Sequence, residues 1–281
     1  MRTRRLPTAR SLALRALDRA SLLHAAYRAY EALRSVRRGA DDGRHAADGL
    51  PLPPASLRTV VAGTPGVTWF VESGRQQADI IREAFERHGK PVDEADRMLD
   101  FGCGCGRVLR HWSDLSGPEI HGSDYNRRLI RWCESNLPFA QFSVNDLHPP
   151  LEHESGTFDL AYGISVFTHL PEDLERAWIA ELGRILAPGG LLLLTTHGEG
   201  YLDRLDAAER ERYLAGDAVV RWASVAGTNL CTTFHPEGYV RERLAPELEL
   251  LEFTPEGGSV GSRSQDLAVF RKPPEAVTRS T

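Results

Sequence analysis

Residues 97–107 read RMLDFGCGCGR, and this stretch decides the fold. The apolar run RMLDF is typical of a buried strand, and glycines at alternate positions, Gly102, Gly104 and Gly106, follow it. A helix is predicted next, at 107–113. A glycine-rich turn between a strand and a helix lets a ligand approach the backbone closely, beside the positive end of the helix. The sequence therefore predicts a ligand-binding loop at this point of the chain.

The spacing of the glycines disfavours the two common phosphate-binding loops. A Walker loop requires Gly-Lys-Ser/Thr, which the stretch lacks. A dinucleotide-binding loop places its third glycine three residues after the second, and here Arg107 occupies that position. We therefore expect a ligand without a pyrophosphate at this loop.

Strand-like and helix-like segments alternate on both sides of the loop, which predicts a parallel sheet with helices on both faces. A helix is expected first, at 68–89. The predicted strands are 97–101, 119–123, 140–144, 158–163 and 191–195, and the predicted helices between them are 107–113, 126–136 and 172–186.

After residue 196 the alternation ends. Residues 198–246 predict a charged helix, a hairpin and a further helix, and we interpret them as a cap-like insertion. Two strand-like runs follow, LELLEF and DLAVFRK, and a loop as short as theirs requires them to pair antiparallel.

Carboxylates follow the next two predicted strands. Asp124 ends the second strand about 20 residues after the glycine loop, where a carboxylate binds the hydroxyls of a ribose, although it could also cap the following helix. Asp146 follows the third strand, within reach of an adenine amino group, although it could be a turn residue. Together these positions predict a nucleoside site.

This set of motifs, DFGCGCG, Asp124, NDL and FDLAYGISVFTHLPED, resembles the class I S-adenosylmethionine-dependent methyltransferases, over residues 70 to 271. The stretch with SVFTHL is similar to a bacterial branch that acts on small molecules or glycans. The resemblance implies a Rossmann-like doubly wound sheet of seven strands in the order 3-2-1-4-5-7-6, with the last-numbered strand antiparallel. The cofactor residues that it implies are Asp100, Gly102, Cys103, Gly104, Gly106, Arg107, Asp124, Tyr125, Asp146, Leu147 and Ser165. Arg107 could meet the cofactor carboxylate or only solvent.

Three histidines are candidates for a base that removes a proton from the methyl acceptor. His197 directly follows the fifth predicted strand and is the preferred candidate. His169 lies further past the fourth strand, where a packing or capping role is the alternative, and His235 lies on the insertion, which could fold over the acceptor.

Composition limits the partners of the chain. Its 281 residues carry a net charge of −5, which disfavours general binding to polyanions such as nucleic acids. The four cysteines form no paired CxxC motif, so we expect neither a disulfide scaffold nor a metal site. No apolar run is long enough to span a bilayer, and we expect a cytoplasmic protein.

The segment 1–67 predicts an arginine-rich helical arm over 8–38 and a linker, ahead of a methyltransferase domain at 68–272 and a disordered tail at 273–281. Its apolar stripe runs through Leu22, Ala26 and Leu33. A helix of this kind can be a solvated arm or can contact an anionic membrane, which flotation with liposomes would test.

We therefore predict a methyltransferase that uses S-adenosylmethionine, releases S-adenosylhomocysteine and needs no metal. The expected acceptor is an oxygen or nitrogen of a small metabolite, sugar or glycan precursor. The alternatives are an NAD(P)-dependent oxidoreductase and a nucleoside-binding protein without catalysis. The sequence does not indicate the acceptor or the oligomeric state.

Overall fold

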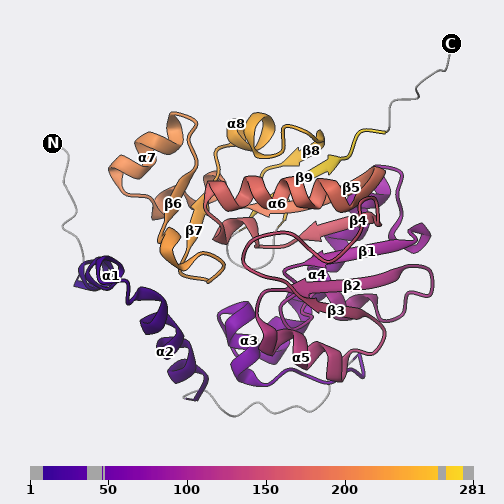
Figure 1. Cartoon of the computed structure of the whole chain (residues 1–281), viewed down its shortest axis with the longest axis horizontal. Coiled ribbons are helices and arrows are strands. Elements are labelled where there is room, and N and C mark those ends of the chain that lie inside the picture. Colours follow the sequence, from indigo (N-terminus) through magenta and orange to yellow (C-terminus); the bar gives the residue numbers. More distant parts are fainter. Residues whose placement is uncertain (1–8, 37–45, 47, 259–263, 275–281) are drawn as a thin grey trace.

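A sheet of seven strands occupies the centre of the molecule (Figure 1). The structure is a computed structural model that describes residues 9–36, 46, 48–258 and 264–274. In spatial order the strands are β3 (Gln141–Val144), β2 (Glu119–Asp124), β1 (Arg97–Phe101), β4 (Phe158–Gly163), β5 (Leu186–Thr196), β9 (Asp266–Arg271) and β8 (Glu249–Thr254). Strand β9 is antiparallel to both of its neighbours, whereas β1 to β5 pair in parallel. The predicted order of the sheet is confirmed.

Helices cover both faces of this sheet, because successive residues of a strand point to opposite faces. On β1, Leu99 packs in one core cluster with Trp178 of α6 (Glu172–Ile185). Its neighbour Met98 packs in the other cluster with Phe85 of α4 (Val67–Arg87). The helix α5 (Arg127–Asn136) joins this second cluster through residues such as Ile130. The central strand β1 is thus packed against helices on both of its faces.

The insertion after β5 contains a separate two-stranded sheet. Its elements are the 3-10 helix Glu199–Arg204, α7 (Ala207–Leu214), β6 (Val219–Arg221), β7 (Thr232–Phe234), α8 (Glu237–Tyr239) and a π-helix, Val240–Leu244. Strands β6 and β7 pair antiparallel, as the predicted hairpin requires. Figure 1 shows this segment beside the carboxyl ends of the strands β1 and β2.

Strand β5 and the helix after the glycine loop differ from their predicted form. Strand β5 begins at Leu186 and not at residue 191, because Leu186 already pairs with Phe158 before the register shifts. Gly189, with φ +76°, lies within this irregular part of the strand. The helix predicted at 107–113 is only a short 3-10 helix, Leu109–Trp112.

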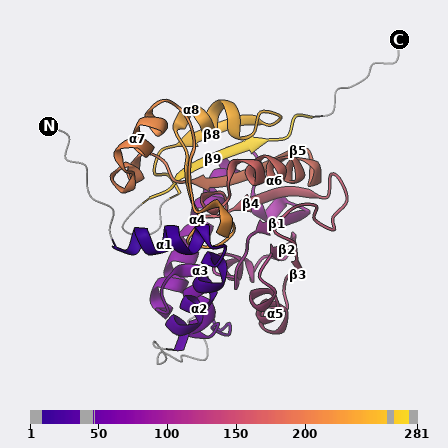
Figure 2. The ribbon, with the colours of Figure 1, turned by 60° about the vertical axis from the view of Figure 1, so that its left-hand side comes forward.

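The N-terminal arm forms two helices in place of the predicted single one. These are α1 (Ala9–Arg19) and α2 (Leu23–Val36), and α2 contacts α3 (Ala55–Ala62). The chain turns between α1 and α2 at Ser21, which has φ +56°. Figures 1 and 2 show both helices beside the insertion and α3.

The buried side of the arm is not the predicted apolar stripe but the row beside it, which contains Leu23. Leu23 is buried against Val225 and Cys231 of the insertion, whereas Leu22 and Leu33 remain exposed. Of the predicted linker, 39–58, residues 39–45 and 47 lie outside the described residues, and its end already forms the start of α3. The predicted tail falls largely on 275–281, which also lie outside them.

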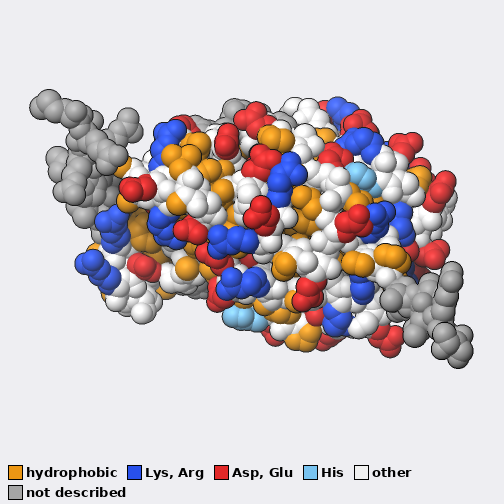
Figure 3. All heavy atoms as spheres, turned by 90° about the horizontal axis from the view of Figure 1, so that it is seen from above, with side chains coloured by type: hydrophobic (Ala, Val, Ile, Leu, Met, Phe, Trp, Pro, Cys, Tyr) orange, Lys and Arg blue, Asp and Glu red, His pale blue; other side chains and the backbone are white. Residues whose placement is uncertain are grey.

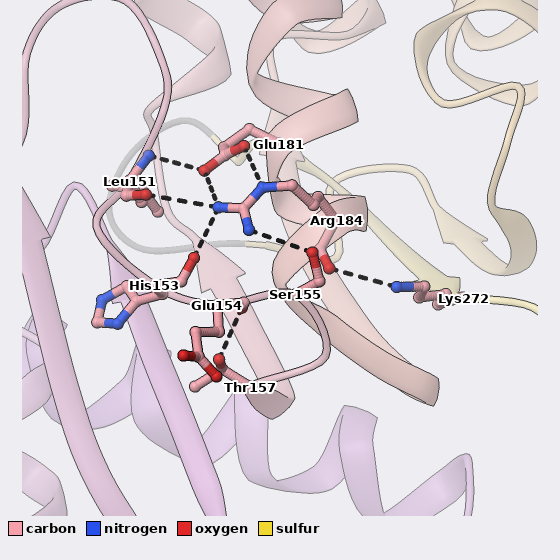
Figure 4. A network of polar contacts seen from close by, with 8 residues as sticks. All are labelled: Leu151, His153, Glu154, Ser155, Thr157, Glu181, Arg184 and Lys272. Atoms are coloured by element: carbon pink, nitrogen blue, oxygen red, sulfur yellow. Dashed lines mark hydrogen bonds and ion pairs between the residues drawn. The ribbon is translucent and has the colours of Figure 1, made fainter.

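An ion pair within α6, between Glu181 and Arg184, holds the segment between β3 and β4 through hydrogen bonds (Figure 4). The Glu181 carboxylate accepts hydrogen bonds from Arg184 at 2.7 and 2.8 Å and from the backbone N–H of Leu151 at 2.7 Å. Arg184 also donates to the carbonyl oxygen of His153 at 2.8 Å. Lys272, which follows β9, donates to the carbonyl oxygens of Arg184 and Leu186. These hydrogen bonds therefore join three parts of the chain, namely the segment between β3 and β4, the helix α6 and the residue after β9.

Replacing Arg184 by methionine should lower the free energy of unfolding by about 1–3 kcal/mol, because the buried Glu181 carboxylate loses its charged partner. Urea unfolding followed by circular dichroism measures this loss. Arg176→Met is the control, since Arg176 and Glu172 form an exposed pair at 3.9 Å that should contribute at most about 1 kcal/mol. Equal losses for the two variants would contradict the role assigned to Arg184.

Candidate active site

A cavity of about 830 Å³ lies at the carboxyl ends of β1, β2, β3 and β4. The strand order reverses between β1 and β4, and open α/β sheets bind ligands at such a switch point. Eleven of the predicted site residues line the cavity, namely Asp100, Gly102, Cys103, Gly104, Arg107, Asp124, Tyr125, Asp146, Leu147, Ser165 and His169. Gly106, His197 and His235 are not among its lining residues.

The glycine loop is held in place by close packing. Gly102, Gly104 and Gly106 all have positive φ, at 76°, 60° and 74°. A Cβ atom on Gly104 would lie 2.7 Å from Val61 of α3, and one on Gly106 would lie 2.5 Å from Leu137. Gly106 therefore serves the contact with Leu137, which explains why it does not reach the cavity as predicted.

Asp124 connects this loop to the end of β2. Its Oδ2 accepts a hydrogen bond from the backbone N–H of Gly104 at 3.0 Å, and its Oδ1 accepts one from the N–H of Asn126 at 2.7 Å. The cap of α5 is Asn126, which accepts from the N–H of Arg128, so Asp124 is not the helix cap. Burial raises the pKa of Asp124 to about 6, against the effect of its two backbone hydrogen bonds.

Three buried polar atoms on the cavity wall have no hydrogen-bond partner among the described residues. They are Oδ2 of Asp100, Nε2 of Gln77 and Oδ1 of Asn145. A buried polar atom without a partner costs about 1–3 kcal/mol, so such atoms indicate a bound ligand or ordered water. They lie on β1, on α4 and directly after β3, and they surround the glycine loop.

Gln77 and Asn145 are missing from the sequence prediction. Gln77 lies on a helix that precedes the first strand, where no motif spacing marks it. Asn145 is next to the predicted Asp146, and its Nδ2 donates to the carbonyl oxygen of Asp146 at 2.7 Å. The VNDL sequence thus located this position to within one residue.

Arg107 and Asp100 form the charged floor of the cavity. A guanidinium N–H of Arg107 donates to Oγ of Ser73 at 3.3 Å, and its charge lies 5.8 Å from the centre of the Trp69 ring. Burial raises the pKa of Asp100 to about 7, although the Tyr162 hydroxyl and Arg107 favour the carboxylate. This carboxyl group therefore binds its proton more tightly than an exposed aspartate does.

Of the three predicted base candidates, His169 alone faces the cavity. Its Nδ1 lies 2.6 Å from the carbonyl oxygen of Cys231. A carbonyl oxygen can only accept, so Nδ1 carries the proton and Nε2 keeps a free lone pair. Burial lowers the pKa of His169, which keeps the ring neutral.

The other two histidines lie behind the cavity wall. His197 is stacked on Tyr201, with ring centres 4.1 Å apart, and burial lowers its pKa to about 2. Such a ring is a weak base, which corrects the preference for His197. His235 is fully buried and its Nε2 lies 2.6 Å from Oε1 of Glu175, so the structure does not bring it to an acceptor.

The loop between β6 and β7 covers the cavity. The Tyr125 hydroxyl donates to the carbonyl oxygen of Gly227 at 2.9 Å, and the N–H of Gly227 donates to the carbonyl oxygen of His169 at 2.8 Å. Nδ2 of Asn229 donates to the carbonyl oxygen of Val60 in α3 at 2.6 Å. The insertion therefore closes over the ends of β2 and β4.

Among the described residues no cluster of three or more His, Cys, Asp or Glu side chains could hold a metal ion. The four cysteines are buried and unbridged. A search of the same described part of the chain for helices long and apolar enough to cross a bilayer finds none.

Asp100→Asn should stabilise the unliganded protein at pH 8 by roughly 2–4 kcal/mol, at about 1.4 kcal/mol per pKa unit. Because burial raises the pKa of Asp100 to about 7, the folded state binds more protons than the unfolded state above pH 4. The free energy of unfolding of the wild type should therefore fall as the pH rises from about 4 through 7. The variant should not lose stability over this range, and it should match the wild type near pH 4. Thermal unfolding at each pH measures the difference, with the exposed Asp217→Asn as control. A difference that does not change with pH would contradict the prediction.

Comparisons with known proteins agree with this geometry. Residues 73–241, more than half of the chain, match the family described as "Methyltransferase domain". A phosphoethanolamine N-methyltransferase 2 of Caenorhabditis elegans is 29% identical over 114 residues, which are 39% of this chain and 25% of that protein. A malonyl-[acyl-carrier protein] O-methyltransferase of Salmonella typhimurium is 30% identical over 111 residues, 40% of this chain and 43% of that protein. The chain thus spans less than half the length of these two relatives.

Solved structures share the fold. A 1,6-didemethyltoxoflavin-N1-methyltransferase of Burkholderia thailandensis, solved with S-adenosylhomocysteine, has a TM-score of 0.51 at 15% identity, over 77% of this chain and 85% of that chain. The PH0226 protein of Pyrococcus horikoshii OT3 has a TM-score of 0.51 at 20% identity, over 70% and 90% of the two chains. The glycine loop, the sheet order and the matched segment together place the chain in one family: it belongs to the methyltransferase-domain family.

Proposed function

We propose that this protein is a methyltransferase that uses S-adenosylmethionine and acts on an oxygen or nitrogen of a small metabolite, sugar or glycan precursor. The observation that carries the proposal is the set of unpaired buried atoms, on Asp100, Gln77 and Asn145, around the glycine loop. These atoms are two hydrogen-bond acceptors and one donor, as a ligand with both amino and carboxylate groups requires.

The cavity residues fit the parts of this cofactor. Asp100 would hold the ammonium group of the methionyl part, and Gln77 and Arg107 its carboxylate. Asp124 would hold the ribose hydroxyls, and Oδ1 of Asn145 would accept from the adenine amino group. When bound, the sulfonium supplies an electrophilic methyl carbon.

The alternative of a nicotinamide-dependent oxidoreductase has less support. Arg107 stands where a dinucleotide loop has its third glycine, and Val61 packs against Gly104 at the centre of the turn. A binding protein without catalysis would share the cavity, and only an observed methylated product separates it from an enzyme.

Wild-type protein should bind S-adenosylhomocysteine in isothermal titration, and Asp124→Ala should weaken this binding roughly 100-fold or more. The variant loses a carboxylate that also positions the N–H of Gly104, and hydrogen bonds to charged groups contribute about 1.5–3 kcal/mol each. Asp217→Asn, which is not among the cavity-lining residues, should bind normally. Binding of NADH by a protein that ignores S-adenosylhomocysteine would overturn the proposed function.

His169 is the base that we assign to the reaction. The bound donor would supply the methyl carbon and its sulfur would keep the electron pair of the broken bond, while the residues of this chain would orient the acceptor and take its proton. The proton of the acceptor passes to the free lone pair of Nε2 on His169, whose other nitrogen is fixed by the Cys231 carbonyl. His169 lines the cavity beside Ser165, past the end of β4.

The names of the relatives cover acceptors as different as phosphoethanolamine, a malonyl-carrier protein and didemethyltoxoflavin. The acceptor of this chain is therefore sought with labelled S-adenosylmethionine and a fractionated host extract. Once a labelled compound is found, His169→Gln should lower kcat by roughly 100- to 10,000-fold, the usual contribution of a general base. Binding of S-adenosylhomocysteine should not change. An equal loss in His197→Gln, or none in His169→Gln, would contradict the assignment.

A further inference from the structure

We propose that Arg204 forms an anion-binding subsite for the methyl acceptor, so that the acceptor carries a carboxylate or phosphate group. This inference rests on the proposed function, because it concerns the acceptor half of the same cavity. Arg204 ends the 3-10 helix that follows β5, and both Arg204 and Tyr201 of this helix line the cavity.

The carboxylates of the cavity lining all lie in one half of it, whereas its arginines, Arg107, Arg128 and Arg204, lie in both halves. Its three acidic side chains, Asp100, Asp124 and Asp146, all lie at the ends of β1, β2 and β3, where the cofactor is proposed to bind. The lining residues after β4 and β5 include Arg204 and the neutral His169 but no carboxylate. The acceptor half of the cavity is thus positive, which favours an anionic ligand there.

Arg204 is held in place without being neutralised. Its guanidinium lies 4.9 Å from the centre of the Tyr201 ring, and its carbonyl oxygen accepts a hydrogen bond from Arg221 at 2.8 Å. Within the described residues, no carboxylate is found within 4.0 Å of the Arg204 guanidinium. By contrast, Arg221 pairs with Glu209 and Arg243 with Asp217 in the same insertion.

The outer surface of the molecule shows, for comparison, how basic and acidic side chains are arranged elsewhere. Figure 3 shows blue and red side chains interspersed over this face of the molecule, so that most basic groups have acidic neighbours. Arg204 is itself an exposed residue, at the cavity lining, and it departs from this arrangement. A guanidinium held on an aromatic ring and lacking a carboxylate is prepared to bind carboxylate or phosphate with two parallel hydrogen bonds.

The guanidinium of Arg204 also lies near His197, behind the cavity wall. Burial is the main cause of the low pKa of His197, with contributions from His169 and His235, and the positive charge of Arg204 adds to it. The guanidinium is therefore close enough to His197 to influence it. The ring of Tyr201 and the side chains of Leu170 and Leu230 supply apolar contacts for the body of the acceptor.

The test uses the full chain saturated with S-adenosylhomocysteine and three probes of similar size, benzoate, phenyl phosphate and the neutral benzamide. Ligand-observed NMR titration should show at least one anion binding about tenfold or more tightly than benzamide, as a charge-assisted hydrogen bond requires. The carboxylate and phosphate arms show which anion is preferred. In Arg204→Gln this preference should be lost, and in Arg204→Lys it should be partly retained.

Arg243→Gln is the matched control, because it removes an arginine of the same insertion outside the cavity lining, and its preference should stay as in the wild type. Equal binding of benzamide, no binding of either anion, or an unchanged preference in Arg204→Gln would overturn the inference. Titration of S-adenosylhomocysteine on the same samples separates the two proposals. If it does not bind, the proposed function fails; if it binds and no anion preference appears, only the subsite fails.

Discussion

The hydrogen bond from the backbone N–H of Gly104 to Asp124 is the contact on which the rest of the site depends. It joins the loop after β1 to the end of β2, and the second carboxylate oxygen holds the start of α5 through Asn126. The loop needs such support because its glycines are all in the left-handed region, which glycine leaves readily in an unrestrained chain. One side chain thus shapes the loop and presents its own charge to the cavity.

The position and type of the central strands could be predicted because buried strands and helices leave periodic patterns in the sequence. The glycine loop and Asp124 were likewise predictable, since each immediately follows a strand. Gln77 was not, because only the packing of α4 against β1 brings a residue from outside the motifs to the cavity. The sequence also could not rank the histidines: their order along the chain says nothing of burial, and burial is what removes His197 and His235.

The arm and the insertion show the same limitation in another form. Their helical and hairpin patterns could be predicted from the sequence. The contacts between the arm and the insertion could not, because no local periodicity indicates which distant residues meet. Leu23 of α2 is buried against Val225, while its neighbour Leu22 is exposed. A one-residue difference of this kind depends on where two distant segments meet, which hydrophobic periodicity alone does not determine.

Because titratable groups of the cavity wall are buried, burial affects which of them carry a charge. Burial raises the pKa of Asp100 to about 7 and lowers the pKa of His169, so charges are costly on these walls unless a partner of opposite sign is present. Electrostatic attraction is stronger in such surroundings than in water. A cationic sulfonium between the carboxylates at β1 and β2 and an anion at Arg204 would be attracted from both sides. Under the proposed function, the neutral imidazole of His169 in this wall would accept the proton that the methyl acceptor releases.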